Sequence, residues 1–404
     1  MLGRNLTGAL EWARMSVYVN VNRIVGGDAA NVNRSAASGL SRPSKSPNAM
    51  NALEAQLDYP LGDTLPDTGS VVEIAPGLLW LRMGLPFALN HINLWLLEDD
   101  IETETGMVHG WTAIDCGISS DATRAAWEQI FASEQLRGLP IVRVLVTHCH
   151  PDHVGLADWL CQRWQAPLWM STGEFGFARM MAAALPGVEG TAMVPHFARH
   201  GLTDPDMLEQ LGTRRAYYAR LVPSVPQSYH RLHDGQMVKI GGDDWRAIAG
   251  FGHSPEHIAL YSARRNILIA GDMVLPRIST NVSVFAVEPE SNPVQQYLDS
   301  LSAYASLPED TLVLPSHGKP FRGLHVRIQQ LRDHHAARLA EVMQACVQPQ
   351  SASDIVPIMF PRSLDSHQIS FAMGEALAHL HLLWFSGALR RRLDDDGIIR
   401  FMHA

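Results

Sequence analysis

The chain has 404 residues, of which 46% are hydrophobic and 18% charged, and its formal net charge is −9. This acidic balance gives no global attraction to nucleic acid or to an anionic membrane, and no apolar run approaches the length of a membrane span. The four cysteines show no close paired spacing, which is typical of a reducing compartment. We therefore predict a cytoplasmic protein without disulfides.

Residues 1–49 differ in composition from the rest of the chain, because they hold six basic side chains against two acidic ones. Residues 29–48 are rich in Ser, Asn and Ala and show no sustained period, which predicts a disordered leader. One interpretation is an organelle transit peptide. The other is a non-native N-terminal extension, with translation beginning at Met50. We favour the second slightly, since no targeting cleavage site stands out.

From residue 70 onward, apolar runs alternate with turn residues. The pattern predicts strands over residues 71–74, 78–83, 92–97, 111–115, 141–146 and 167–170, and again over 237–240, 245–248, 258–261, 267–270 and 311–314. Helical spacing appears over residues 122–136, 154–164, 293–306 and 326–346. Residues 172–233 hold helical stretches and no clear strand, which indicates a helical cap. The prediction for residues 50–346 is an α/β fold, an αββα sandwich of two sheets with helices outside.

Residues 350–404 form a separate pattern. Two helical stretches are followed by the turn Asp394-Asp395-Asp396-Gly397 and a short apolar run over 398–402. Helix, helix, turn and strand at this size resemble a small winged-helix domain. We place Arg390, Arg391 and Arg392 at the end of its recognition helix, which keeps nucleic acid open as a partner.

Residues 147–153 read Thr-His-Cys-His-Pro-Asp-His, directly behind the apolar run 141–146. Polar side chains at the edge of a core are costly unless something pairs with them. A divalent metal is such a partner, because imidazole nitrogen and carboxylate oxygen are usual zinc ligands. Since no helix can run through Pro151, the cluster is expected on a loop between a strand and a helix. The candidate ligands in this segment are His148, His150, Asp152 and His153.

Four more residues follow the carboxyl ends of apolar strands, where α/β proteins build their sites. They are Asp115, His253, Asp272 and His317. Together with the first cluster they supply imidazoles, terminal carboxylates and one carboxylate free to bridge, which is what a two-metal site needs.

The complete set resembles the metallo-β-lactamase superfamily over roughly residues 70–320, and within it the glyoxalase II-like branch. The resemblance implies that one metal is held by His148, His150 and His253. The second is then held by Asp152, His153 and His317, with Asp272 as the bridge. Asp115 would lie behind the ligands and orient one of them. His257, four residues after His253, is a candidate for the same role or for a substrate contact, with a structural role as the alternative. Two departures are visible: Asp272 stands where the β-lactamases usually carry Cys or Ser, and Leu156 replaces a glycine of glyoxalase II.

The resemblance implies a binuclear hydrolase with two zinc ions per chain, iron and manganese being alternatives. A metal-bridging hydroxide, oriented by Asp152, would cleave an ester, a thioester such as a hydroxyacylglutathione, or a lactone. Arg277, Asn281 and His91 are candidates to line the pocket for this small acyl substrate, whereas Cys149 is expected to pack. The alternative is a metal-dependent phosphodiesterase or ribonuclease that holds nucleic acid with the C-terminal domain. A homodimer is left open.

Overall fold

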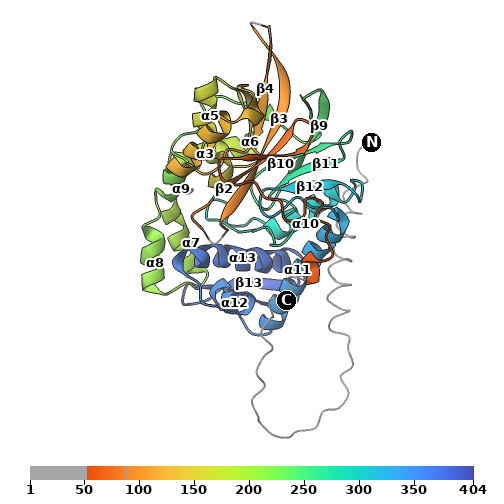
Figure 1. Ribbon diagram of the computed structural model, residues 1–404. Coiled ribbons are helices and arrows are strands. Elements are labelled where there is room, and N and C mark those ends of the chain that lie inside the picture. The colour runs from red at the N-terminus through yellow and green to blue at the C-terminus, as the bar shows by residue number, and fades with distance from the viewer. Residues whose placement is uncertain (1–51, 88, 105) are drawn as a thin grey trace, which may run out of the picture.

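The computed structural model describes residues 52–87, 89–104 and 106–404. Two β-sheets lie face to face with helices on their outer sides (Figure 1), which confirms the predicted αββα sandwich. The leader predicted over residues 1–49, and Met50 after it, lie outside the described residues. No helix in the described part of the chain combines the length and the apolar composition needed to cross a membrane.

The first sheet has seven strands in sequential order. They are β1 (Val71–Ala75), β2 (Leu78–Gly84), β3 (His91–Thr103), β4 (Gly106–Ile114), β5 (Ile141–Leu145), β6 (Leu168–Ser171) and β7 (His230–Leu232). The second sheet has the order β12 (Leu312–Pro315), β11 (Ile267–Gly271), β10 (His257–Ser262), β9 (Asp243–Gly250) and β8 (Met237–Ile240). The sequence analysis missed β7, whose three residues are too short to show a pattern, and it missed the outer half of the β3–β4 hairpin.

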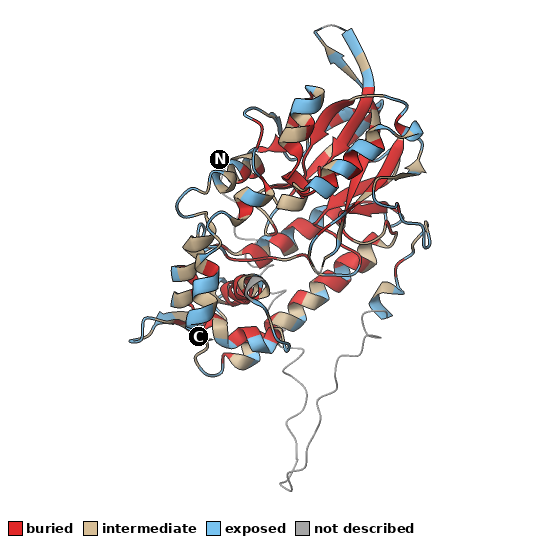
Figure 2. Ribbon diagram, turned by 60° about the vertical axis from the view of Figure 1, so that its left-hand side comes forward, coloured by how far each residue is buried: buried red, intermediate tan, exposed pale blue. Residues whose placement is uncertain are grey.

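Successive side chains of a strand point to opposite faces of the sheet, so alternate residues pack between the sheets or against the outer helices. In β2, Leu78 and Trp80 point between the sheets, while Leu79 and Leu81 point outward to the first layer of helices. The strands are accordingly buried on both faces over most of their length (Figure 2). Such burial explains why they appear in the sequence as near-continuous apolar runs.

Helices cover the outer faces of both sheets. The first sheet is covered by α3 (Asp121–Phe131) and α5 (Ala157–Trp164), and the second by α10 (Pro293–Tyr304) and α11 (Leu324–Ala345). A short helix, α4 (Pro151–Val154), begins at Pro151, as the restricted φ of proline favours. Between β6 and β7 lie α6 (Thr172–Ala182), α7 (Met193–Arg199), α8 (Pro205–Gly212) and α9 (Tyr217–Leu221).

The C-terminal segment consists of α12 (Ala352–Met359), α13 (Ser366–Phe385) and the hairpin β13 (Leu389–Leu393) and β14 (Ile399–His403). The placement of Arg390, Arg391 and Arg392 in a recognition helix was wrong, because all three lie on β13. The run precedes a turn that ends in Asp-Gly and is followed by a second short run over 399–403, and this hairpin signal outweighs helix propensity here. The winged-helix description stays a prediction.

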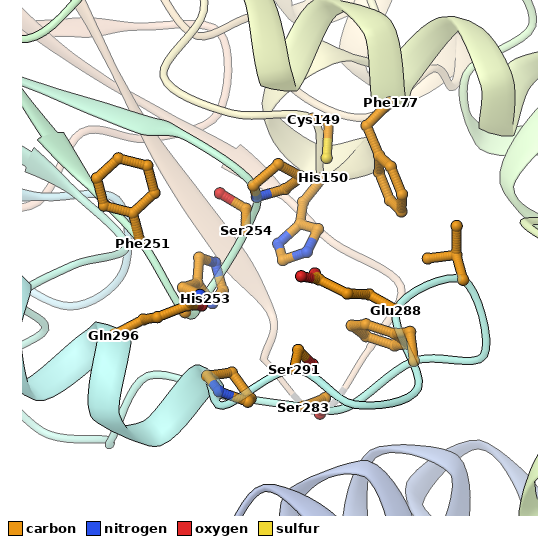
Figure 3. A pocket seen from close by; sticks show the side chains of 15 residues that line it. Cys149, His150, Phe177, Phe251, His253, Ser254, Ser283, Glu288, Ser291 and Gln296 are labelled. Atoms are coloured by element: carbon orange, nitrogen blue, oxygen red, sulfur yellow. The ribbon is translucent and has the colours of Figure 1, made fainter. Parts of the chain in front are cut away.

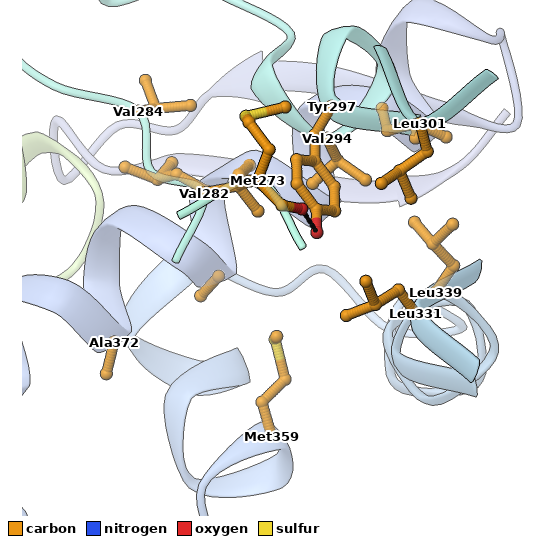
Figure 4. Packing of buried hydrophobic residues seen from close by; sticks show 14 of the residues in the cluster. Met273, Val282, Val284, Val294, Tyr297, Leu301, Leu331, Leu339, Met359 and Ala372 are labelled. Carbon is orange, nitrogen blue, oxygen red and sulfur yellow. Dashed lines mark hydrogen bonds between the residues drawn. The ribbon is translucent and has the colours of Figure 1, made fainter. Parts of the chain in front are cut away.

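The C-terminal helices share a core with the second sheet. Figure 4 shows Met273 and Val282, from the segment after β11, packed with Tyr297 of α10 and facing Met359 and Ala372 of α12 and α13. The Tyr297 hydroxyl donates to the carbonyl of Met273 at 3.0 Å. The segment after β11 is therefore fixed between sheet and helices, and this segment starts at Asp272.

Candidate metal centre

The candidate residues converge because the strands that carry them end at one edge of the sandwich. β4 and β5 are parallel neighbours, as are β11 and β12, so their carboxyl ends coincide. A backbone hydrogen bond of 2.9 Å from Ile258 to the carbonyl of Thr147 joins the two sheets at this edge. This edge of the sandwich carries all the candidate residues, namely Asp115, His253, Asp272, His317 and the cluster His148–His153.

One group of side chains brings four donor atoms together: those of His148, His150, His253 and Asp272. Nε2 of His148 lies 2.9 Å from Nδ1 of His150 and 3.3 Å from Nε2 of His253. Nε2 of His253 lies 3.4 Å from Oδ2 of Asp272. These are close to the separation of about 3.3 Å between neighbouring ligand atoms that tetrahedral zinc with bonds of about 2.0–2.1 Å produces.

A second group consists of Asp152, His153 and His317. Nε2 of His317 lies 3.4 Å from Oδ2 of Asp152, and Nε2 of His153 lies 3.7 Å from the same oxygen. Both imidazole nitrogens are 3.5 Å from Oδ1 of Asp272. Asp272 thus presents one carboxylate oxygen to each group, which is the geometry of a bridging ligand.

The donor atoms fit a pair of divalent cations. Nε2 of His153 and Oδ1 of Asp272 are buried and have no hydrogen-bond partner, although buried polar atoms are normally satisfied. Both atoms point into the space between the two groups. Nitrogen and oxygen donors of this kind suit zinc, and also iron or manganese, so the residues present are chemically adequate for the cations that the sequence predicted.

Electrostatics differ between the two groups. Burial, and then the neighbouring imidazoles, hold the pKa of His148 well below its usual range; burial and His253 lower the pKa of His150 to about 3. Burial also opposes protonation of His153, but the carboxylates of Asp115, Asp152 and Asp272 outweigh it and raise its pKa to about 9. Without a cation, His148 and His150 are therefore neutral at pH 7, whereas His153 holds a proton on each ring nitrogen.

Both histidines of the second group are oriented by a hydrogen bond on the side away from the site. Nδ1 of His153 donates to Oδ2 of Asp115 at 2.8 Å, and Asp115 also accepts the backbone N–H of Thr147 at 2.8 Å. Nδ1 of His317 donates to the carbonyl oxygen of His91 at 2.7 Å. Nδ1 of both histidines consequently carries a proton at all times, and Nε2 is turned toward the site.

His257 supports the bridge through the backbone. Its Nε2 accepts the backbone N–H of Asp272 at 3.2 Å, and its ring is buried 5.0 Å from that of His148. Gly271 has φ of +53°, and a Cβ there would lie 2.2 Å from Nε2 of His257. Only glycine permits this approach, so residues 271 and 257 together fix where Asp272 points.

The three residues expected to contact substrate make protein contacts in this structure, and their role toward a substrate stays a prediction. Arg277 is largely exposed and its Nε is 3.7 Å from a carboxylate oxygen of Glu54. Asn281 acts through its carbonyl oxygen, which accepts Nδ1 of His253 at 2.8 Å. His91 accepts through its carbonyl and through Nε2, which takes the backbone N–H of Gly318 at 2.8 Å. The last two therefore position site loops.

Glu174 was missed by sequence reasoning. Its buried carboxylate accepts the backbone N–H of Cys149 at 2.8 Å, the hydroxyl of Ser254 at 2.6 Å and the backbone N–H of Glu256 at 2.6 Å. Ser171-Thr-Gly-Glu174 reads as a helix capping box, which predicts a local role. The side chain instead joins the loop of His148 and His150 to the loop of His253.

A pocket opens beside the first group (Figure 3). Its walls carry His150 and His253, four large apolar side chains, two prolines and the carboxylate of Glu288. The apolar side chains are Phe177 of α6 and Phe251, Phe285 and Val287 from loops of the sandwich. The hydroxyl of Tyr218 in α9 donates to the carbonyl of Cys149 at 2.5 Å, so the insertion between β6 and β7 braces the site.

Comparison with known proteins agrees with this geometry. Residues 109–317 match the model of the metallo-β-lactamase superfamily, and residues 339–404 match a metallo-β-lactamase-like C-terminal domain. The chain belongs to the metallo-β-lactamase superfamily. It is 60% identical to a β-lactamase domain protein from Burkholderia ambifaria, over 88% of this chain and 100% of that one, with a TM-score of 0.82.

More distant members align as well. A metallo-β-lactamase family protein from Thermus thermophilus is 28% identical, with coverage of 82% of this chain and 100% of that one and a TM-score of 0.66. The probable metallo-hydrolase YqjP of Bacillus subtilis is 25% identical over 75% of this chain and 91% of its own length. The chain is accordingly a metallo-hydrolase of this superfamily.

Proposed function

We propose that this chain is a binuclear, zinc-dependent hydrolase that cleaves an ester, a thioester or a lactone. The observation that carries the proposal is the division of the Asp272 carboxylate, with Oδ2 beside the first group and Oδ1 beside the second. A single cation needs no such arrangement, whereas two cations need a shared ligand between them. Iron or manganese in the same positions is the alternative.

A pair of bound divalent cations supplies Lewis acidity, which lowers the pKa of water toward neutrality and polarises an acyl carbonyl. The residues of the chain supply the remaining functions. Asp152 is partly exposed at the floor of the site and can accept a hydrogen bond from the attacking water while it binds. Glu174, Asp115 and His257 hold the ligand loops rigid, so that the site is preorganised.

No side-chain nucleophile is required. Cys149 lies between two candidate ligands, but it is buried within the core beside the first sheet. Burial, and then the carboxylate of Glu174, raise the pKa of its thiol. A thiol held neutral in this way is a poor nucleophile, which leaves hydrolysis by water as the reaction that the site favours.

Two observations favour acyl chemistry over phosphodiester cleavage. The arginines that were expected to hold nucleic acid are largely occupied: Arg391 pairs with Glu290 at 2.6 Å and Arg392 pairs with Asp394. In addition, this chain is 25% identical to the atrochrysone carboxyl ACP thioesterase of Aspergillus fumigatus over 56% of this chain and 55% of that enzyme. The glyoxalase II-like assignment is part of the same proposal, and it concerns the metal centre rather than the identity of the acyl substrate.

The test compares substrates on zinc-loaded protein, with a chelated sample and the Asp272→Ala variant as controls. The substrates are para-nitrophenyl esters, S-lactoylglutathione and bis-para-nitrophenyl phosphate. We expect chelator-sensitive acyl cleavage that exceeds phosphodiester cleavage and is lost in Asp272→Ala. Faster phosphodiester cleavage would make the nuclease alternative the better account.

A further inference from the structure

The entrance of the pocket is apolar on several sides. Phe251, Phe285 and Val287 are 43%, 37% and 43% exposed, and all three line the pocket together with Phe177. Isolated apolar side chains at a surface need no explanation, but a group that converges on one cavity indicates a surface that an apolar ligand covers. The walls beside the candidate metal centre thus suit a hydrocarbon or aromatic substituent.

The charge at this entrance is negative. Glu288 is exposed and lines the pocket, and Figure 3 shows its carboxylate directed from its loop toward His150. Among the described residues that line the pocket there is neither lysine nor arginine. Arg391, the basic residue held near this loop, pairs with Glu290 and lies 3.9 Å over the ring of Trp384. Glu288 therefore has no cation at the pocket wall to neutralise it.

We propose that Glu288 is a specificity-determining residue that selects against anionic substrates, so that the substrate class is an uncharged compound with an apolar acyl group. This inference rests on the proposed acyl hydrolysis and narrows it. The cations of the site attract a carbonyl oxygen, whereas the remainder of the substrate lies beside Glu288 and the apolar side chains. A glutathione thioester, which carries two carboxylates, is then a poor substrate.

The expected discrimination against anionic substrates can be derived from the repulsion between a substrate carboxylate and the exposed carboxylate of Glu288. A substrate carboxylate several ångströms from Glu288 is repelled by an energy that water and salt reduce, which corresponds to a discrimination of about threefold to tenfold at low ionic strength. Reversal of the charge at position 288 replaces this repulsion by attraction. The discrimination is then expected to change by about tenfold or more.

The experiment uses two isosteric pairs on the zinc-loaded full chain at low salt. The first is the para-nitrophenyl ester of isocaproic acid against mono-para-nitrophenyl succinate, in which a carboxylate replaces the isopropyl group. The second is the matching pair of hydroxamic acids, whose binding is measured by calorimetry without turnover. Wild type is compared with Glu288→Gln and Glu288→Lys. Glu290→Gln, two positions along the loop and outside the pocket lining, is the control.

We expect wild type to prefer the uncharged member of each pair, Glu288→Gln to lose most of this preference, Glu288→Lys to reverse it, and Glu290→Gln to retain it. Equal preferences in wild type and both Glu288 variants overturn the inference, as does a wild-type preference for the anionic members. Charge discrimination in hydroxamate binding without ester turnover overturns the proposed acyl hydrolysis but retains the role of Glu288.

Discussion

The side-chain amide of Asn281 donates to Oε2 of Glu375 at 3.4 Å, and this contact joins helix α13 to the segment that follows β11. The carbonyl oxygen of the same Asn281 accepts Nδ1 of His253. One residue thus links the C-terminal helix to a candidate metal ligand. The C-terminal segment is therefore part of the architecture that positions the site.

Stability near pH 6 is expected to depend on Glu375. Burial raises its pKa to about 7, so the folded state holds this proton more tightly than the unfolded state. Stability is consequently lost as pH rises from about 4.5 through 7, by roughly 3 kcal/mol for a shift of this size. Glu375→Gln should remove the loss, which urea unfolding at pH 5 and pH 8 measures. The same substitution at exposed Glu209 is the control, and an equal response in both variants would contradict the account.

The substitution Asp115→Asn should lower the zinc affinity of the second group and leave that of the first group unchanged. The amide keeps the size of the side chain but cannot accept from both Thr147 and His153 as the carboxylate does. We expect zinc affinity to fall by about tenfold to a hundredfold for one ion and to remain for the other. Asp99→Asn, another buried aspartate that pairs with Arg143 instead, tests for general destabilisation. Equal weakening of both ions would argue against the assigned role.

The substitution Glu174→Gln should lower both the stability of the protein and the zinc affinity of the first group. An amide keeps one acceptor oxygen, so its NH₂ group faces either the donor of Cys149 or the donors of Ser254 and Glu256. The lost charge-assisted hydrogen bonds correspond to about 2–4 kcal/mol. Thermal unfolding and zinc titration measure the two consequences. Glu256→Gln is the matched control, because that carboxylate accepts the backbone N–H of Gly173 and does not reach the loop of Cys149. A stable variant with unchanged affinity would show that the clamp is dispensable.

Loading with zinc near pH 7 should release protons from the second group. The pKa of His153 is about 9, and the Asp272 and Asp152 carboxylates outweigh burial to hold the pKa of His317 well above its usual range. The cation displaces both protons. Because metal-free His153 loses its proton as pH rises through about 9, its share of the release should vanish above that pH. Calorimetry in buffers of different ionisation enthalpy measures it, and pH-independent release would contradict the assignment.

The features that the sequence predicted correctly are those whose residues are close together in the chain. Buried strands such as residues 141–145 and 267–271 are apolar runs bounded by turns, and the motif at 147–153 lies within seven positions. What it missed depends on contacts between distant segments. Glu174 meets partners 25 and 80 residues away, while His91 and Asn281 act through carbonyl oxygens, which every residue type possesses. The arginines of β13 were misplaced because a hairpin signal was interpreted as a helix end.

The most direct test of the two-cation site is the number of zinc ions retained per chain after reconstitution and dialysis, measured by mass spectrometry on wild type and Asp272→Ala. The bridging geometry of Asp272 predicts two ions for wild type and no more than one for the variant. One ion or fewer in wild type, or an unchanged count in Asp272→Ala, would contradict the binuclear site.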